Sequence, residues 1–114
     1  MSKYNSKKVT LDGIKFDSKK EARRYKELKL LERAGEIKDL KLQPRYTLQE
    51  SFKHEEATIR KIEYVADFQY EDTRTGQTIV EDVKTEPTKT QVYRIKKKLF
   101  LKRYGEQVKF IEVI

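Results

Sequence analysis

Two runs of alternating apolar and polar residues between Ile62 and Thr85 restrict the fold more than any other feature of this chain. The apolar side of the first run comprises Ile62, Tyr64, Ala66, Phe68 and Tyr70. The second run covers residues 77–85 and follows a turn at residues 72–76. Because successive side chains of a strand point to opposite faces, the pattern predicts two half-buried strands joined as a hairpin. One face of this hairpin is apolar, and the other carries the acidic residues.

The segment before these strands combines a short hairpin with a helix. Residues 9–16 form two short extended stretches around Asp12-Gly13, a dipeptide that tolerates the positive φ of a type I′ turn. Apolar residues then recur at helical spacing, namely Ala22, Tyr25, Leu28 and Leu31. Gly35 follows them as a helix-terminating residue. The sequence therefore predicts an N-terminal hairpin and a first helix over residues 18–34.

The remaining segments complete an α/β order. Leu40, Leu42, Tyr46 and Leu48 alternate along a strand, in which Pro44 indicates an edge or a bulge. The polar residues 49–57 are expected to form a loop. Thr88 and Gln91 have capping-box spacing, which predicts a second helix over residues 89–104 ended by Gly105. Residues 108–114 form a closing strand, so the order is hairpin, helix, three strands, helix, strand.

Length and charge limit the class of protein. A chain of 114 residues has the size of one domain, covering residues 1–114. Lysine and arginine outnumber aspartate and glutamate by 27 to 19, and the net charge of +8 favours a polyanionic partner. The absence of cysteine excludes disulfides and thiolate metal sites. No segment approaches the ~20 apolar residues of a membrane span, and no apolar stretch follows the charged N-terminus. We therefore expect a soluble, cytoplasmic protein.

The candidate chemistry lies in the second strand of the hairpin, at residues 80–84, together with Asp67. Asp82 and Lys84 share one face of the strand, while Glu81 points to the other. The hairpin register places Asp67 beside Asp82. Two adjacent carboxylates repel unless a cation or a proton neutralises them, so the pair indicates a metal site. The alternative is an ordinary solvated strand edge, on which Asp and Lys are common.

The pattern Asp67…Asp82-Val83-Lys84, with Glu21 on the first helix, resembles the PD-(D/E)XK nuclease superfamily. Within it, the chain is similar to small phage-encoded endonucleases and to the nuclease domain of the Tn7-type transposase subunit. The stretches that carry this likeness are residues 16–25, 34–37, 43–44, 67–68 and 80–84. Ala66 stands where the name-giving proline would be. The resemblance implies a restriction-endonuclease-like core, in which helices flank a central mixed four-stranded sheet.

The resemblance also implies roles for individual residues. Asp67, Asp82, the Val83 carbonyl and Glu21 would bind Mg²⁺ or Mn²⁺, and Lys84 would be the catalytic lysine. Glu21 has a second interpretation, because Ser18 and Glu21 have capping-box spacing and the carboxylate could stabilise the helix start. Branched-DNA resolvases of this resemblance are usually dimers, which suggests a homodimer here.

Basic residues cluster on both predicted helices. Residues 3–29 include Lys3, Lys7, Lys19 and Arg23, and the second helix includes Arg94, Lys96 and Lys97. We expect Lys19, Arg23, Arg94, Lys96 and Lys97 to contact DNA, although a charge run is also typical of a plain solvated face. The leading hypothesis is a metal-dependent DNA endonuclease, phage-derived and acting in recombination, repair or processing of DNA. The alternative is a non-catalytic nucleic-acid-binding module on the same scaffold.

Overall fold

The computed structural model describes residues 8–114, so Lys3, Lys7 and the rest of the charged N-terminal segment lie outside the described residues. Its helices are α1 (Lys19–Arg33) and α2 (Gln91–Tyr104), with a 3₁₀ turn η1 (Glu86–Thr88). Its strands are β1 (Val9–Leu11), β2 (Ile14–Phe16), β3 (Ile37–Leu42), β4 (Arg45–Gln49), β5 (Phe52–His54), β6 (Ala57–Ile59), β7 (Ile62–Val65), β8 (Phe68–Asp72), β9 (Thr78–Val83) and β10 (Lys109–Val113).

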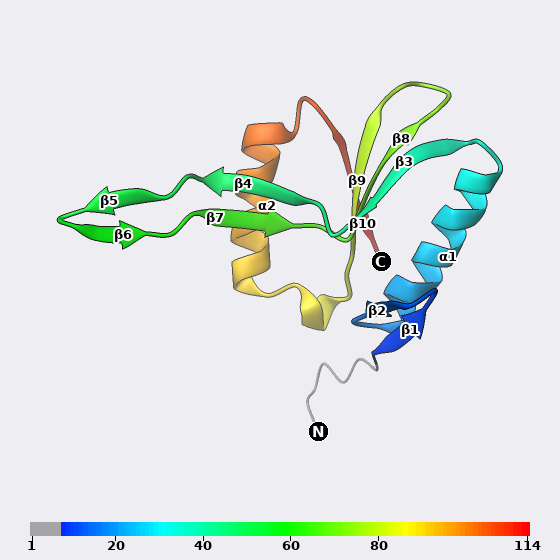
Figure 1. Cartoon of the computed structure of the whole chain (residues 1–114), viewed down its shortest axis with the longest axis horizontal. Coiled ribbons are helices and arrows are strands. Elements are labelled where there is room, and N and C mark those ends of the chain that lie inside the picture. Colours follow the sequence, from blue (N-terminus) through cyan, green and yellow to red (C-terminus); the bar gives the residue numbers. More distant parts are fainter. Residues whose placement is uncertain (1–7) are drawn as a thin grey trace.

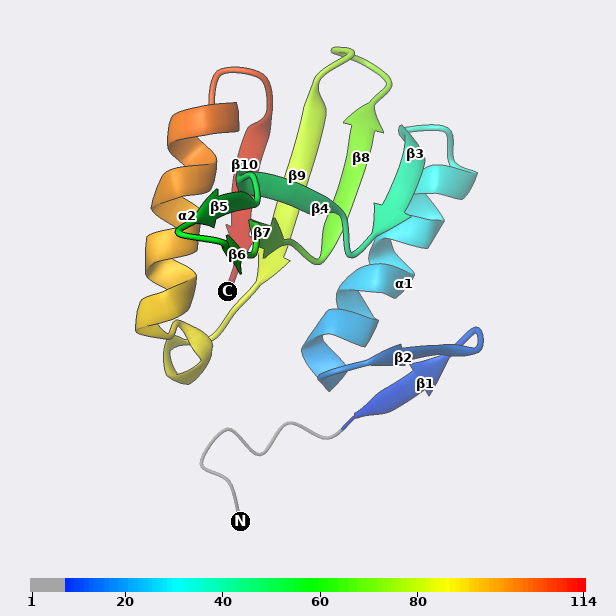
Figure 2. The same cartoon turned by 60° about the vertical axis from the view of Figure 1, so that its left-hand side comes forward.

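Four of these strands form one mixed sheet in the order β10-β9-β8-β3. β10 runs parallel to β9, whereas β8 is antiparallel to both β9 and β3. A parallel pair needs a crossover connection, and α2 supplies it between β9 and β10. Figure 2 shows the sheet between α1 and α2. The expected mixed α/β architecture, with helices flanking a four-stranded sheet, is therefore confirmed.

The sheet separates two apolar cores. Ile79 packs in the core that contains Ala22, Tyr25 and Leu28 of α1. Its neighbour Val80 packs in the core that contains Tyr93 and Phe100 of α2, together with Tyr64 and Ala66. Because adjacent residues of a strand face opposite ways, α1 and α2 cover opposite faces of the sheet.

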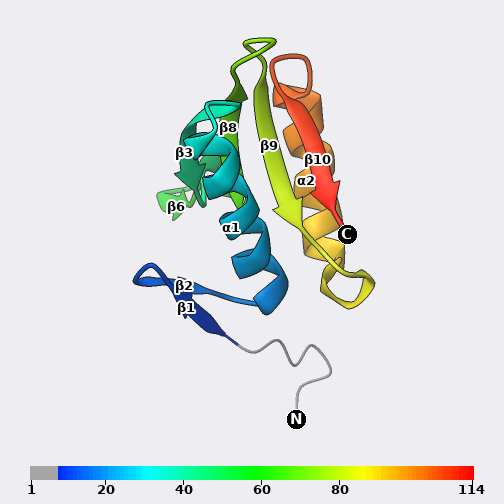
Figure 3. The ribbon, with the colours of Figure 1, turned by 90° about the vertical axis from the view of Figure 1, so that its right-hand side faces the viewer.

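The N-terminal hairpin and the limits of α1 agree with the sequence. Asp12 and Gly13 both have positive φ, at 53° and 75°, as a type I′ turn requires. Ser18 caps α1 by accepting the Glu21 amide at 3.1 Å. Gly35 follows the helix with φ 76°. Figure 3 shows the β1–β2 hairpin beside the N-terminal end of α1.

The two long strands expected around residues 40–48 and 62–70 are each broken, so that prediction was wrong. The first breaks at Gln43, which has φ 51°, and Pro44, which cannot donate to a ladder. The second breaks at Ala66 and Asp67. The breaks lie opposite each other: the Gln43 amide donates to the Asp67 carbonyl at 2.9 Å, and the Ala66 amide donates to the Pro44 carbonyl at 3.1 Å. Both strands thus leave the main sheet together, and β4 pairs with β7 outside it.

The segment 49–57 is not a loop, which is a second correction. β5 pairs with β6 around a turn in which Glu55 and Glu56 have φ 47° and 73°. A loop was expected because the segment is polar, and no Gly or Asn marks the turn in the sequence. Residues 45–65 thus form a projecting two-stranded arm, which is called the arm below (Figure 1).

The second helix begins two residues later than expected. Thr90, not Thr88, is its cap and accepts the Tyr93 amide at 3.1 Å. Thr88 instead closes η1 through hydrogen bonds with Thr85. Gly105 ends the helix as expected. Of the helices within residues 8–114, none has both the length and the apolar composition to span a membrane.

Candidate functional site

Asp67 and Asp82 lie side by side at one end of the four-stranded sheet. Phe68 of β8 pairs with Glu81 of β9. Asp67, which precedes Phe68, therefore lies opposite Asp82, which follows Glu81, as the hairpin register predicts. Asp67 donates its amide to the Glu81 carbonyl at 3.1 Å, and its Oδ2 accepts the Val83 amide at 2.7 Å. Asp67 occupies the break between β7 and β8 rather than the interior of a continuous strand. The bend therefore brings its carboxylate against the end of β9.

Lys84 lies on the same side as Asp82, as the strand period predicts. Its Nζ is 3.4 Å from Asp82 Oδ1 and 4.6 Å from the centre of the Tyr93 ring. Asp82 is almost fully buried, and its Oδ2 accepts a hydrogen bond from the Tyr64 hydroxyl. Lys20 of α1 donates its ammonium to the Lys84 carbonyl at 3.3 Å. The Lys84 ammonium therefore borders Asp82, and the Lys20 ammonium lies at the backbone of Lys84.

Glu21 joins this group from the first turn of α1. Its amide bonds Ser18, which is the first half of the capping box. Among the described hydrogen bonds, none joins its carboxylate to the Ser18 amide, which would be the second half. Glu21 is buried, and burial together with the charge of Asp17 raises the pKa of its carboxyl to about 7. The charge of Asp82 adds to this rise, and that of Lys84 opposes it.

The surroundings of Asp67 disfavour the ionised form of its carboxyl. Burial is the main reason that the pKa of Asp67 rises to about 8, and the negative charges of Asp82 and Glu21 add to it. The Val83 amide favours the ionised form of Asp67 but does not offset these effects. Asp67 therefore retains a proton near neutral pH unless another positive charge approaches.

The donor set fits a hard divalent cation in its chemistry, because carboxylate oxygens are what Mg²⁺ and Mn²⁺ prefer. Within residues 8–114, no three acidic or histidine side chains are grouped closely enough to hold a metal ion. Asp67 and Asp82 would then be the two protein carboxylates of such a site. Mg²⁺ commonly binds through one or two carboxylates and keeps several waters. The Glu21 carboxylate would lie in an outer position and act on the cation through its charge.

Glu81 faces away from this site, as the sequence predicts. It is fully buried, and both its oxygens accept hydrogen bonds from Arg24, from Nε and from an Nη at 2.7 Å each. The Tyr70 hydroxyl donates to the same carboxylate. This bidentate pair ties α1 to the centre of the sheet. Glu81 is thus bound to structural partners, whereas Asp82 lies beside Asp67.

The basic residues expected to contact DNA differ in their surroundings. Lys19 and Arg23 of α1 are exposed, and within residues 8–114 neither of them, nor the half-buried Lys96, has an ion-pair partner. Arg94 is exposed and lies 3.6 Å from Glu86. Lys97 is bound to Glu112 at 3.1 Å. Lys97 is therefore partly neutralised within the protein.

Comparison with known proteins gives one family. A family model for DUF1064, described as a protein of unknown function, matches residues 1–113. The chain belongs to the DUF1064 family. Neither the curated proteins nor the solved structures gave a match.

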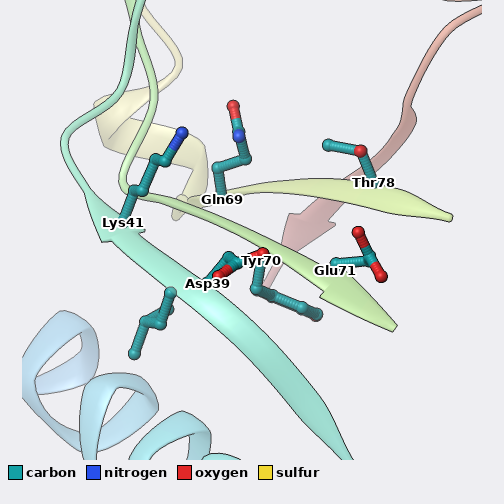
Figure 4. A pocket seen from close by; sticks show the side chains of 7 residues that line it. Asp39, Lys41, Gln69, Tyr70, Glu71 and Thr78 are labelled. Carbon is teal, nitrogen blue, oxygen red and sulfur yellow. The ribbon is translucent and has the colours of Figure 1, made fainter. Parts of the chain in front are cut away.

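A separate hollow of this DUF1064 chain lies further along β8. It encloses about 350 Å³ between β3, β8 and β9. Figure 4 shows the side chains of Lys41, Gln69 and Thr78 around it. Gln69 already accepts the Tyr46 hydroxyl at 2.5 Å. None of the candidate metal or catalytic residues lines this hollow.

Sequence reasoning missed two residues that contact the site, Lys20 and Tyr64. Lys20 appeared only as one of many basic residues, although it lies next to Glu21 and turns toward the end of β9. Tyr64 was assigned to one apolar face together with Phe68 and Tyr70, but that was wrong. Tyr64 packs in the core with Phe100, whereas Phe68 and Tyr70 pack in the other core, because the break at Ala66 and Asp67 reverses the faces. A buried tyrosine needs a partner for its hydroxyl, and that requirement was the available signal. The partner, Asp82, is 18 residues away in sequence.

Proposed function

We propose that this protein is a Mg²⁺- or Mn²⁺-dependent DNA endonuclease with a restriction-endonuclease-like core of the PD-(D/E)XK type. The observation that carries the proposal is the pair Asp67 and Asp82, with the ammonium of Lys84 3.4 Å from Asp82 Oδ1. The raised pKa of Asp67 supports it, because burial and the negative charges of Asp82 and Glu21 disfavour its ionised form, and a bound cation would offset them. The order α1, β3, β8, β9, α2 and β10 of the four-stranded sheet and its two helices also supports it.

Asp67 and Asp82 would hold the cation, with the Val83 carbonyl beside them and Glu21 in an outer position. When bound, such a cation polarises a phosphoryl oxygen and lowers the pKa of a water molecule. In hydrolysis the oxygen of water bonds to phosphorus, one phosphorus–ester oxygen bond breaks, and the leaving oxygen takes up a proton. Lys84 donates hydrogen bonds to the phosphate oxygens on which negative charge accumulates.

DNA would approach the end of the sheet between the two helices. Lys19 and Arg23 on α1 and Arg94, Lys96 and Lys97 on α2 supply positive charge on either side of the carboxylates. Each phosphate that they neutralise releases counterions, which favours binding. A phage-derived, cytoplasmic enzyme of DNA recombination, repair or processing fits this chemistry, with branched DNA as one substrate to test.

Cleavage assays on linear, nicked, branched and single-stranded DNA test the proposal. We expect cleavage in Mg²⁺ or Mn²⁺, none in EDTA, and none by Asp82→Ala. Lys84→Ala should reduce the rate by about 10²–10³, the usual effect of losing one transition-state donor. Both variants should bind DNA nearly as well as the wild type. A wild-type protein that leaves every substrate uncut in both metals contradicts the proposal.

One observation favours a second candidate, a non-catalytic nucleic-acid-binding module. Both oxygens of Asp82 already have partners within the protein, Tyr64 and Lys84. Such a carboxylate can be stable without a cation. Calorimetric titration with Mn²⁺ separates the two functions: saturable binding that Asp67→Ala abolishes supports the nuclease, and no binding supports the module.

A further inference from the structure

The outer face of α2 carries an apolar stripe that nothing in the described chain covers. Val92, Ile95 and Leu99 are 62%, 51% and 46% exposed. Their spacing of three and four residues places them on one side of the helix. The opposite side, with Tyr93 and Phe100, packs against the sheet. Single exposed apolar residues are common, but an aligned stripe marks an interaction surface.

The arm has a second uncovered apolar surface. Phe52 and Ile59 are cross-strand partners, and they are 48% and 38% exposed. Every residue from 51 to 60 is exposed. A two-stranded hairpin alone in water is at best marginally stable, so the outer half of the arm needs a partner.

The two surfaces have complementary charge. α2 carries six basic residues and no acidic one: Arg94, Lys96, Lys97, Lys98, Lys102 and Arg103. Lys98 and Lys102 lie one turn beyond Ile95 and Leu99 and form a basic row along the stripe. The turn of the arm carries two adjacent acids, Glu55 and Glu56, whereas the basic residues of the outer arm, Lys53, Arg60 and Lys61, lie away from it, on β5 and just after β6. In a chain of net charge +8, the tip of the arm is locally acidic.

The arm cannot easily cover the stripe of its own α2. Its root is fixed on the sheet-facing side of that helix: Tyr104 donates to the Thr47 carbonyl at 2.8 Å, and Tyr46 packs on Phe100. Arg103, one turn beyond Leu99, donates to the same carbonyl at 3.0 Å. From this root the tip extends away from the body (Figure 1).

We infer that the partner is a second copy of this chain, and that the arm of each copy lies along the α2 stripe of the other. In a two-fold dimer the arm–stripe contact occurs twice, once in each direction. The two contacts together bury twice the surface of one, and a stable interface needs about 800 Å² from each partner. Phe52 and Ile59 would pack on Ile95 and Leu99, and Glu55 and Glu56 would face Lys98 and Lys102. DNA is a poor occupant, because the adjacent carboxylates Glu55 and Glu56 at the turn repel phosphates and the apolar Phe52 and Ile59 do not bind them.

Sedimentation of the full chain over a range of concentrations tests this assembly. We expect a dimer whose dissociation constant rises with salt and rises at least about tenfold in Leu99→Glu. Leu30→Glu is the matched control, because Leu30 is a 61% exposed leucine on α1 and should change nothing. A wild-type chain that stays monomeric at every concentration overturns the inference, as does a dimer insensitive to Leu99→Glu.

Charge reversal and cross-linking distinguish this arrangement from any other dimer. The double variant Glu55→Lys/Glu56→Lys should weaken the dimer, and adding Lys98→Glu/Lys102→Glu to the same chain should restore it. The chain has no cysteine, so single cysteines can be placed freely. A mixture of Glu56→Cys and Lys98→Cys proteins should form a mixed dimer with a bismaleimide cross-linker, whereas Glu56→Cys with Lys38→Cys should not. Failure of both tests contradicts the arm exchange. The inference does not depend on nuclease activity, because sedimentation and cross-linking report association and not cleavage.

Discussion

At the scale of single residues, the period of two in residues 80–84 was sufficient to separate Glu81 from Asp82. The strand geometry alone decides which way each side chain points. It does not decide what each side chain meets. Arg24 and Tyr70 bind Glu81 from positions 57 and 11 residues away, and no local pattern indicates such partners. The face of each residue was therefore predictable, whereas its hydrogen-bond network was not.

The buried pair between Glu81 and Arg24 leads to a stability prediction. Glu81→Ala should lower the free energy of unfolding by about 3 kcal/mol, because it leaves the Arg24 guanidinium without its buried counter-charge. The double variant Arg24→Met/Glu81→Met should recover part of this loss. Urea unfolding measures both. Lys38→Ala, which breaks the exposed pair with Glu71, is the control and should cost less than about 1 kcal/mol. Equal losses in the control and in Glu81→Ala would contradict the structural role of the buried pair.

The raised pKa values of Asp67 and Glu21 predict that the metal-free protein loses stability as pH rises. Both carboxyls have a higher pKa in the folded state, about 8 and about 7, than in the unfolded state near 4. Their contribution is fully present below pH 4 and is lost as pH rises through 7 and 8. In EDTA the free energy of unfolding should therefore fall between pH 5 and 8.5, by on the order of 2 kcal/mol.

Asp67→Asn should remove most of that slope, since an amide does not titrate. The chosen range avoids Glu112, where burial is outweighed by hydrogen bonds from Tyr93, Lys89 and Lys97 that lower the pKa to about 2. That residue affects stability only as pH falls below its ordinary value near 4.5. A flat profile for the wild-type protein would show that Asp67 is not electrostatically strained.

At the scale of elements, long periodic segments were predictable and interruptions were not. α1, β9 and β10 lie where alternation, helical spacing and Gly35 indicate. Pro44 marked one break, but the matching break at Ala66 and Asp67 has no local signal, because a bend in one strand forces a bend in its partner. The Glu55-Glu56 turn lacks the residues that usually mark a hairpin. The arm was missed for these reasons, although the candidate site was not.

The start of α2 gives a prediction at this scale. Thr90→Ala should destabilise the protein by about 1 kcal/mol, because it removes the acceptor for the Tyr93 amide. Thr90→Ser keeps a hydroxyl at that position and should be close to the wild type. Thermal unfolding followed by circular dichroism compares the two. If the alanine and serine variants were equally destabilised, the hydroxyl of Thr90 would not be the cap.

At the scale of the whole molecule, composition indicated a polyanionic partner but could not show how the charge is distributed. The folded chain places basic residues on α1 and α2, on opposite faces of one sheet, with the carboxylate pair at its end. These basic residues differ in how far their charge is balanced within the protein. Lys97 is bound to Glu112, while Lys96 has no ion-pair partner within residues 8–114. Only the fold reveals this difference.

Salt dependence of DNA binding measures which charges meet phosphate. For a duplex probe, the slope of log K against log salt changes by about 0.9 for each phosphate contact. Arg23→Ala and Lys96→Ala should each reduce the slope by about that amount. Lys97→Ala should reduce it less, because part of the charge of Lys97 is already balanced by Glu112 at 3.1 Å. Lys38, an exposed lysine at the opposite end of β3 from the carboxylate pair, is the control. If Lys38→Ala lowered the slope as much as Arg23→Ala, binding would follow net charge alone, and the proposed orientation of DNA across the end of the sheet would be wrong.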